Sequence, residues 1–168
     1  MDHSALLTDA FDRIQESVHS TVADLSMDAL TYRVDDDANT IAWLVWHLTR
    51  VQDDHVAGVA GTAQVWLTGE WAPRFDLPFP ELSIGYGHSS LDVARVRSGA
   101  DLLRGYHDAV HDRTVDYVQR LEADDLDRIV DENWSPPVTL GVRLVSVIAD
   151  DLQHAGQAAY VRGLYERR

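Results

Sequence analysis

The C-terminal segment, from Thr139 to Arg168, carries apolar residues at helical spacing along its whole length. These residues are Leu140, Leu144, Val147, Ile148, Leu152, Ala155, Ala158 and Val161. This period predicts one long amphipathic helix, which must bury its apolar face against other elements. Pro136 and Pro137 end whatever precedes this helix, and the Thr139 hydroxyl is suited to cap its first turn.

Three earlier segments show the same period, at residues 4–25, 40–60 and 99–121. We predict Asn39 as the N-cap of the second segment and Gly61 as the residue that ends it. Four such segments predict an all-α fold, a four-helix bundle. The chain has 168 residues and is 45% hydrophobic, which suffices for one core. We therefore expect a single domain that spans residues 1–168.

The second and third predicted helices are joined by a long crossover, residues 62–90. Its aromatic residues are Trp66, Trp71, Phe75, Phe79 and Tyr86. Connections longer than about 12–15 residues are usually functional or disordered, and so many aromatic side chains argue against disorder. We therefore expect an ordered crossover that packs across the bundle. The residues leave open whether it also walls a pocket or is purely structural.

The composition excludes several classes of function. A formal net charge of −14 argues against nucleic acid and anionic lipid as partners, because both are bound through basic surfaces. No apolar run is long enough to span a membrane, and the acidic N-terminus does not resemble a signal peptide, so we expect a cytoplasmic protein. The chain has no cysteine, so any thiol chemistry must use an external thiol.

A carboxylate and an imidazole stand one helical turn apart at Asp150 and His154. Their side chains share one face of the C-terminal helix, and Gln157 extends the row. His47, on the flank of the apolar stripe of the second helix, is a third candidate. Two imidazoles and one carboxylate form a ligand set that suits Zn, with Ni, Fe and Mn also compatible, and three ligands leave positions open for water or substrate.

Spacing alone leaves other interpretations open. Asp150 and His154 could be a polar pair that bridges two helices, and Asp151 is also within reach of His154. His107 and His111 form an equally spaced pair on the third helix, but their charged neighbours indicate a solvated face.

His55, next to Asp53 and Asp54, is a further candidate on the second helix. His55 falls on the inner stripe of that helix. A buried, neutral, hydrogen-bonded imidazole is therefore favoured there over a metal ligand.

Two stretches resemble a known family. The sequence NTIAWLVWHLTRVQDDH, followed much later by DDLQHAGQAAYVRGL, resembles the DinB-like superfamily of metal-binding four-helix bundles. It is most similar to the branch with the N-terminal domain of mycothiol-dependent maleylpyruvate isomerase. The family's W-x-x-H-L pattern is matched around His47, and its second ligand motif is matched by Asp150 and His154. This chain has aspartate where many members have histidine and the isomerase branch has glutamate.

The resemblance implies a thiol-dependent transferase or isomerase. A divalent metal on His47, Asp150 and His154 would bind a low-molecular-weight thiol such as mycothiol, which then reacts with a small electrophile. Gln157 would orient the groups around the metal or contact the substrate, and we also assign Asp54 and His55 to this role. A homodimer is a further expectation from the resemblance. The alternative is a non-catalytic or vestigial metal-binding bundle, which the shortened carboxylate favours.

Overall fold

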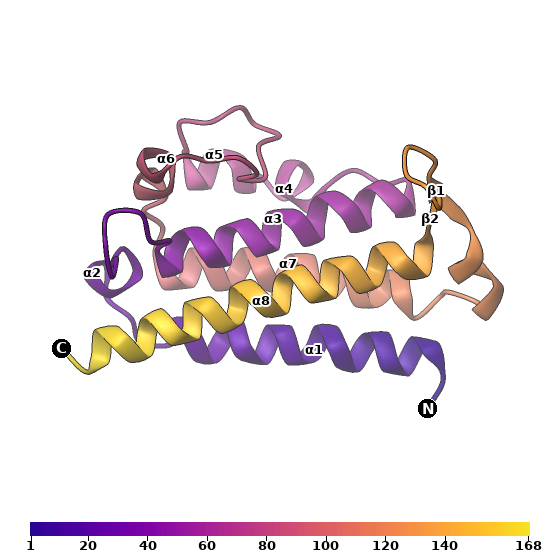
Figure 1. Cartoon of the computed structure of the whole chain (residues 1–168), viewed down its shortest axis with the longest axis horizontal. Coiled ribbons are helices and arrows are strands. Elements are labelled where there is room, and N and C mark those ends of the chain that lie inside the picture. The colour runs from indigo at the N-terminus through magenta and orange to yellow at the C-terminus, as the bar shows by residue number, and fades with distance from the viewer.

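Four long helices form the body of the protein in the computed structural model, which describes residues 1–168. They are α1 (His3–Val22), α3 (Ile41–Ala60), α7 (Ala100–Val118) and α8 (Leu140–Glu166). Helix α3 packs against α7 and α8, and α1 packs against the same two helices, so the four enclose one core (Figure 1). The predicted all-α four-helix bundle with a long crossover is therefore confirmed.

The ends of the helices follow from local capping groups. The Thr139 hydroxyl accepts a hydrogen bond from the Val142 amide at 3.3 Å, as predicted for the start of α8. Gly61 ends α3 in the left-handed conformation, with φ of 67°. The predicted cap of α3 was wrong by one residue, because Thr40 and not Asn39 accepts from the Trp43 amide.

Shorter elements connect the long helices. They are α2 (Met27–Leu30), α4 (Val65–Thr68), α5 (Trp71–Phe75), α6 (Ser90–Arg95), the 3-10 helix η1 (Ala123–Asp127), and the strands β1 (Ile129–Asp131) and β2 (Val138–Thr139). The two strands pair antiparallel just before α8 begins. This hairpin was not predicted from the sequence, because its strands are too short to produce a visible alternation of apolar and polar residues.

The crossover is ordered and lies along α3, as predicted (Figure 1). Trp66, Trp71 and Phe75 are buried in it, and the ring of Trp66 contacts those of Trp46 and Tyr106 at centroid distances of 6.5 and 5.1 Å. Helix α3 is consequently covered by α7, α8 and the crossover. This explains why all of its residues from 41 to 53 are buried.

The buried stripe of α8 differs from the predicted one at a single turn. Leu152 was predicted to face the core but is 47% exposed, whereas Asp151 is fully buried. The buried positions Val147, Asp151 and Ala155 follow each other at intervals of one helical turn, and Leu152 lies about 100° away from that line. An aspartate therefore occupies the place in the core that the apolar pattern assigned to a leucine.

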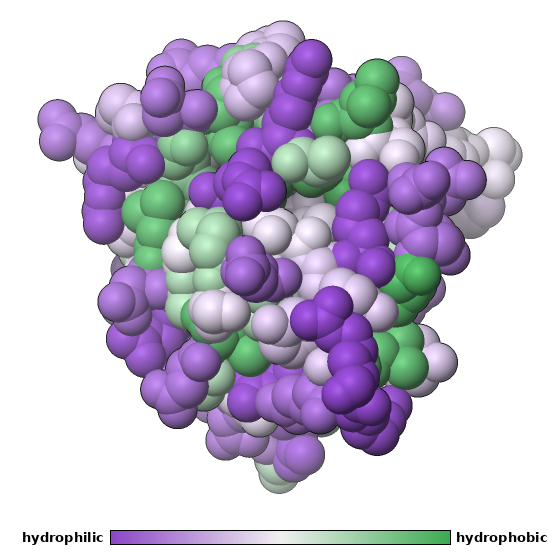
Figure 2. Space-filling model, turned by 90° about the vertical axis from the view of Figure 1, so that its left-hand side faces the viewer, coloured by the Kyte–Doolittle hydropathy of each residue, from purple (hydrophilic) through white to green (hydrophobic).

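The outer surface is mainly polar. Hydrophilic residues prevail on the end of the molecule shown in Figure 2, where hydrophobic residues gather in small separate patches. None of the helices combines the length and the apolarity needed to cross a membrane.

Candidate metal centre

Helices α3 and α8 bring the three predicted ligands together. His47, Asp150 and His154 each offer one nitrogen or oxygen atom, and these atoms lie within 4.8 Å of one another. Within α8, the His154 Nε2 is 3.7 Å from an oxygen of Asp150. Across the two helices, the imidazole rings of His47 and His154 meet edge to face with their centroids 4.8 Å apart. The three side chains therefore face a common point.

His47 is held in one orientation by the crossover and by its own helix. Its Nδ1 hydrogen-bonds to the main-chain carbonyl of Ile84, and its ring stacks on Trp43 at 4.6 Å with an interplanar angle of 17°. A carbonyl oxygen only accepts, so Nδ1 carries the proton and Nε2 keeps a free lone pair. Burial lowers the pKa of this imidazole, which favours its neutral form. His47 is thus prepared to act as a ligand through Nε2.

His154 has the same tautomer for a similar reason. Its Nδ1 lies 3.1 Å from the amide oxygen of Gln157, one turn further along α8. Donation to that oxygen leaves the lone pair on Nε2, the nitrogen that faces Asp150. Gln157 therefore lies behind a candidate ligand. Such a partner fixes the tautomer and the ring orientation of a metal-binding histidine.

Asp150 offers an oxygen that has no partner within the chain. Its Oδ2 is buried and accepts no hydrogen bond. A buried carboxylate oxygen without a donor is costly, and a bound cation removes that cost. Together with the two imidazole nitrogens, a carboxylate oxygen of Asp150 forms a borderline-soft set of three ligands. The residues present therefore fit a divalent transition metal.

The structure separates Asp150 from its neighbour Asp151. Asp151 is fully buried in the bundle, and both of its carboxylate oxygens lack a hydrogen-bond partner. Burial raises its pKa well above the usual value, and the nearby charge of Asp150 raises it further. Asp151 does not belong to the cluster with His47 and His154. The carboxylate that faces the two imidazoles is that of Asp150.

Asp54 and His55 lie outside the cluster, further along α3. His55 was predicted to be buried, but about a third of its side chain is exposed, and its Nδ1 is 3.6 Å from an Asp54 oxygen. Asp54 also accepts a hydrogen bond from the Gln64 side chain at 2.7 Å. Both residues line an open depression of about 530 Å³ together with Arg128 and Arg143. Neither residue contacts a candidate ligand through a hydrogen bond.

The charged neighbours of His107 and His111 had indicated a solvated face, but both histidines are buried. His107 is fully buried and His111 is 8% exposed, because α1 covers this side of α7. His111 pairs with Asp12 of α1 at 2.8 Å, whereas neither ring nitrogen of His107 has a partner. Burial lowers the pKa of His107 to about 3. The two imidazoles form no metal-binding group with a third residue.

Sequence reasoning missed His88, which lies behind His47 in the crossover. Its Nδ1 accepts a hydrogen bond from the indole of Trp43 at 3.2 Å, and its Nε2 lies 3.1 Å from the Ser83 hydroxyl. Its ring also stacks on Trp46 at 5.7 Å. His88 thus fixes the aromatic wall on which His47 rests. No regular spacing connects it to the ligands, and only its place in an aromatic-rich segment could have indicated its role.

The buried Asp53 of α3 anchors the start of the crossover. Its carboxylate accepts hydrogen bonds from the main-chain amides of Val65 and Trp66 at 2.8 and 2.7 Å. The Tyr106 hydroxyl donates a third hydrogen bond at 2.8 Å. Burial raises the pKa of Asp53, and these three hydrogen bonds oppose that rise. Sequence reasoning had considered Asp53 only as a neighbour of His55.

Arg50, one turn before Asp53 and fully buried, anchors the far end of the crossover. Its Nε donates to the carbonyl of Ser83 at 3.2 Å, and its Nη1 lies 3.6 Å from an Asp53 oxygen. Ser83 directly precedes Ile84, whose carbonyl holds His47. One buried ion pair on α3 therefore fixes both ends of the segment that orients a candidate ligand.

Comparison with known proteins agrees with this architecture. A sequence profile described as mycothiol-S-transferase matches residues 6–167. The chain belongs to the mycothiol S-transferase family. This is a DinB-like family, in agreement with the resemblance noted in the sequence. The chain is also similar to a solved structure, that of a conserved protein from Enterococcus faecalis, with 30% sequence identity and a TM-score of 0.92 over 100% of this chain and 99% of that one. A comparison with curated proteins gives no significant match.

Proposed function

We propose that this family member is a divalent-metal-dependent S-transferase that uses a low-molecular-weight thiol, such as mycothiol, as a substrate. His47, Asp150 and His154 would hold the metal. The observation that carries the proposal is that one ring nitrogen each of His47 and His154 and one carboxylate oxygen of Asp150 lie within 4.8 Å of one another. The family match supports the choice of the thiol and of the type of reaction.

The chain itself supplies no thiol, since it contains no cysteine. A divalent metal bound by the three residues would supply Lewis acidity that keeps an external thiol deprotonated near neutral pH. Zn suits two imidazoles and one carboxylate best, and Ni, Fe and Mn are compatible alternatives. The thiolate is the nucleophile in such a transfer, and a small electrophile is its partner.

The residues around the cluster would hold the ligands and limit the access of water. Ile84 and Gln157 keep the Nδ1 protons of the two imidazoles in place. Trp43 covers His47 on one side, and His47 itself is only 7% exposed. The side chain of His154 is 18% exposed and that of Asp150 is 39% exposed, so substrates would approach from the side of α8.

Metal content is the direct test of the proposal. Freshly purified protein should contain one equivalent of a divalent metal, and His47→Ala and His154→Ala should each lose it. His19→Ala is a matched control, because His19 pairs with Asp108 away from the cluster and is 40% exposed. Protein that stays metal-free after incubation with Zn or Ni would support a non-catalytic bundle instead.

A conjugation assay with a generic electrophile then tests the reaction. Turnover should require both the thiol and the metal. Unchanged turnover when the thiol is omitted would contradict thiol transfer and point to hydrolysis by metal-bound water.

A further inference from the structure

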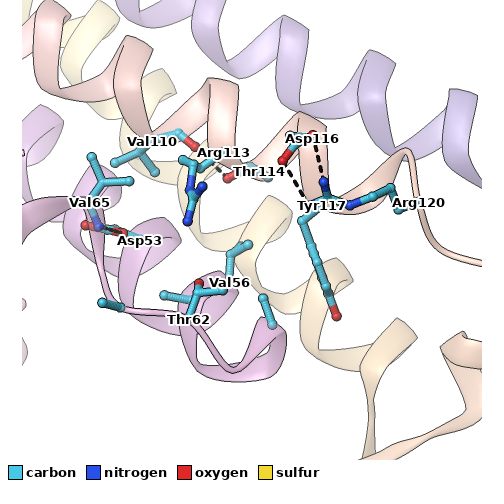
Figure 3. A pocket seen from close by; sticks show the side chains of 13 residues that line it. Asp53, Val56, Thr62, Val65, Val110, Arg113, Thr114, Asp116, Tyr117 and Arg120 are labelled. Carbon is cyan, nitrogen blue, oxygen red and sulfur yellow. Dashed lines mark hydrogen bonds and ion pairs between the residues drawn. The ribbon is translucent and has the colours of Figure 1, made fainter. Parts of the chain in front are cut away.

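A cavity of about 200 Å³ lies between the C-terminal halves of α3 and α7, near the start of the crossover (Figure 3). Val56, which lines it, follows His47 by nine residues. At about 100° per residue this places the two side chains on opposite sides of α3. None of the candidate metal ligands lines the cavity. It is therefore separate from the metal centre.

The floor of the cavity is apolar and shielded from water. Val56, Ala57, Val65 and Val110 line it, and each is at most 9% exposed. A ligand that covers these side chains gains hydrophobic stabilisation in proportion to the area that it removes from water. The cavity is smaller than the roughly 300–1,000 Å³ of pockets for drug-sized molecules. It therefore suits a small ligand with an aliphatic body.

Arg113 of α7 places a free positive charge over this floor. Its side chain extends from the helix into the space that Val56 and Thr62 border (Figure 3). The guanidinium makes no hydrogen bond or ion pair within the chain, whereas the neighbouring Arg120 is occupied by Asp116 at 2.9 Å. Its planar donors match a carboxylate in a bidentate arrangement.

Neither of the two acidic residues that line the cavity cancels this charge, and the first of them, Asp116, is already paired with Arg120 at 2.9 Å. Asp53 lines the floor but is 3% exposed, and its oxygens already accept hydrogen bonds from two main-chain amides and from Tyr106. Arg50 lies 3.6 Å from it on the inner side. The charge that reaches the mouth of the cavity is therefore that of Arg113.

From this arrangement we propose that the cavity is a second ligand site, which binds a small aliphatic carboxylate. The aliphatic body would cover the valine and alanine floor, and the carboxylate would pair with Arg113. This site does not depend on the proposed S-transferase activity.

Hexanoate is a suitable probe for the full-length protein. Hexan-1-ol has the same body without the charge, and acetate has the charge without the body. Titrations followed by methyl NMR should give saturable shifts of Val56 and Val110 with hexanoate. Binding of hexan-1-ol and of acetate should be about ten-fold weaker or undetectable.

Variants separate the site from other surfaces. Arg113→Gln should weaken hexanoate binding about ten-fold. Arg104→Gln, on the same helix but outside the cavity and paired with Asp101, should leave it unchanged. His47→Ala should also bind hexanoate normally, which keeps the test independent of the metal. Equal binding of hexan-1-ol and hexanoate, wild-type affinity in Arg113→Gln, or the absence of saturable shifts at Val56 and Val110 would each overturn the proposal.

Discussion

Gly85 lies against the imidazole of His47 so closely that a Cβ atom at residue 85 would stand 2.8 Å from Nδ1. This nitrogen is the one that donates to the carbonyl of Ile84, the preceding residue. Gly85 also has a φ of 92°, which L side chains rarely adopt. The crossover can therefore reach His47 only because residue 85 has no side chain.

Gly85→Ala should weaken metal binding at the candidate centre by about ten-fold or more, because the displaced crossover no longer orients His47. Gly87→Ala is a matched control. Gly87 also has a positive φ, of 75°, but a Cβ there meets no atom within 4 Å. Gly87→Ala should destabilise the fold by about 1 kcal/mol and leave metal affinity unchanged. Metal titration and urea unfolding of both variants measure the two effects, and equal metal affinities would refute the role of Gly85.

Asp150→Asn should reduce metal affinity by at least about ten-fold, since it removes the only anionic ligand of the cluster. Asp151→Asn should retain the metal, because Asp151 lies in the bundle core. Competition with a chromogenic chelator gives both affinities. The reverse result would assign the ligand to Asp151.

Arg50→Met should destabilise the protein by about 3–5 kcal/mol, because it leaves the Asp53 carboxylate buried without its counter-ion. Arg13→Met is the control: Arg13 pairs with Asp9 on the surface, with 70% of its side chain exposed, and stability should barely change. Urea unfolding measures both variants. A small effect in Arg50→Met would show that the buried pair does not anchor the crossover.

Much of the fold could be predicted because apolar periodicity reports burial directly. The four long helices, the Gly61 terminus and the Thr139 cap all depend on local signals within a few residues. Two of the errors have a different origin. At Asp151 and His107 a polar residue occupies a core position, and a pattern of apolar residues cannot indicate this.

The candidate site was only partly readable from sequence. Asp150 and His154 share one helix, so their proximity follows from a spacing of four residues. The contacts of His47 with Ile84 and Gly85 depend on how the crossover folds back over α3, and no local period encodes that path. The charged neighbours of His107 suggested that its face of α7 is exposed to solvent. For this reason the packing of α1 against that face was not predicted.

The pH dependence of stability should report the buried His107. Its pKa of about 3 in the folded protein lies below the usual 6.5 of the unfolded chain. Between these two values the unfolded state binds more protons, so this residue lowers stability as the pH falls from 6.5 toward 3. His107→Phe should therefore gain stability relative to wild type by about 2.7 kcal/mol on going from pH 7.5 to pH 4.5. A difference in unfolding free energy that stays constant between these two pH values would contradict this.

Gln157→Leu should lower metal affinity by about ten-fold, since the Nδ1 proton of His154 loses its acceptor and the ring is free to change tautomer. Gln157→Glu should preserve or strengthen binding, because a carboxylate accepts the same proton and makes the imidazole a better donor to the metal. Gln153→Leu is the control, because the Gln153 side chain, one residue before His154, bonds only to the carbonyl of Ala149. Metal titration together with ¹⁵N chemical shifts of the His154 ring distinguishes a loss of the tautomer from a general loss of structure. If Gln157→Leu keeps both the affinity and the ring shifts of wild type, the hydrogen bond from His154 to Gln157 has no part in preparing the ligand.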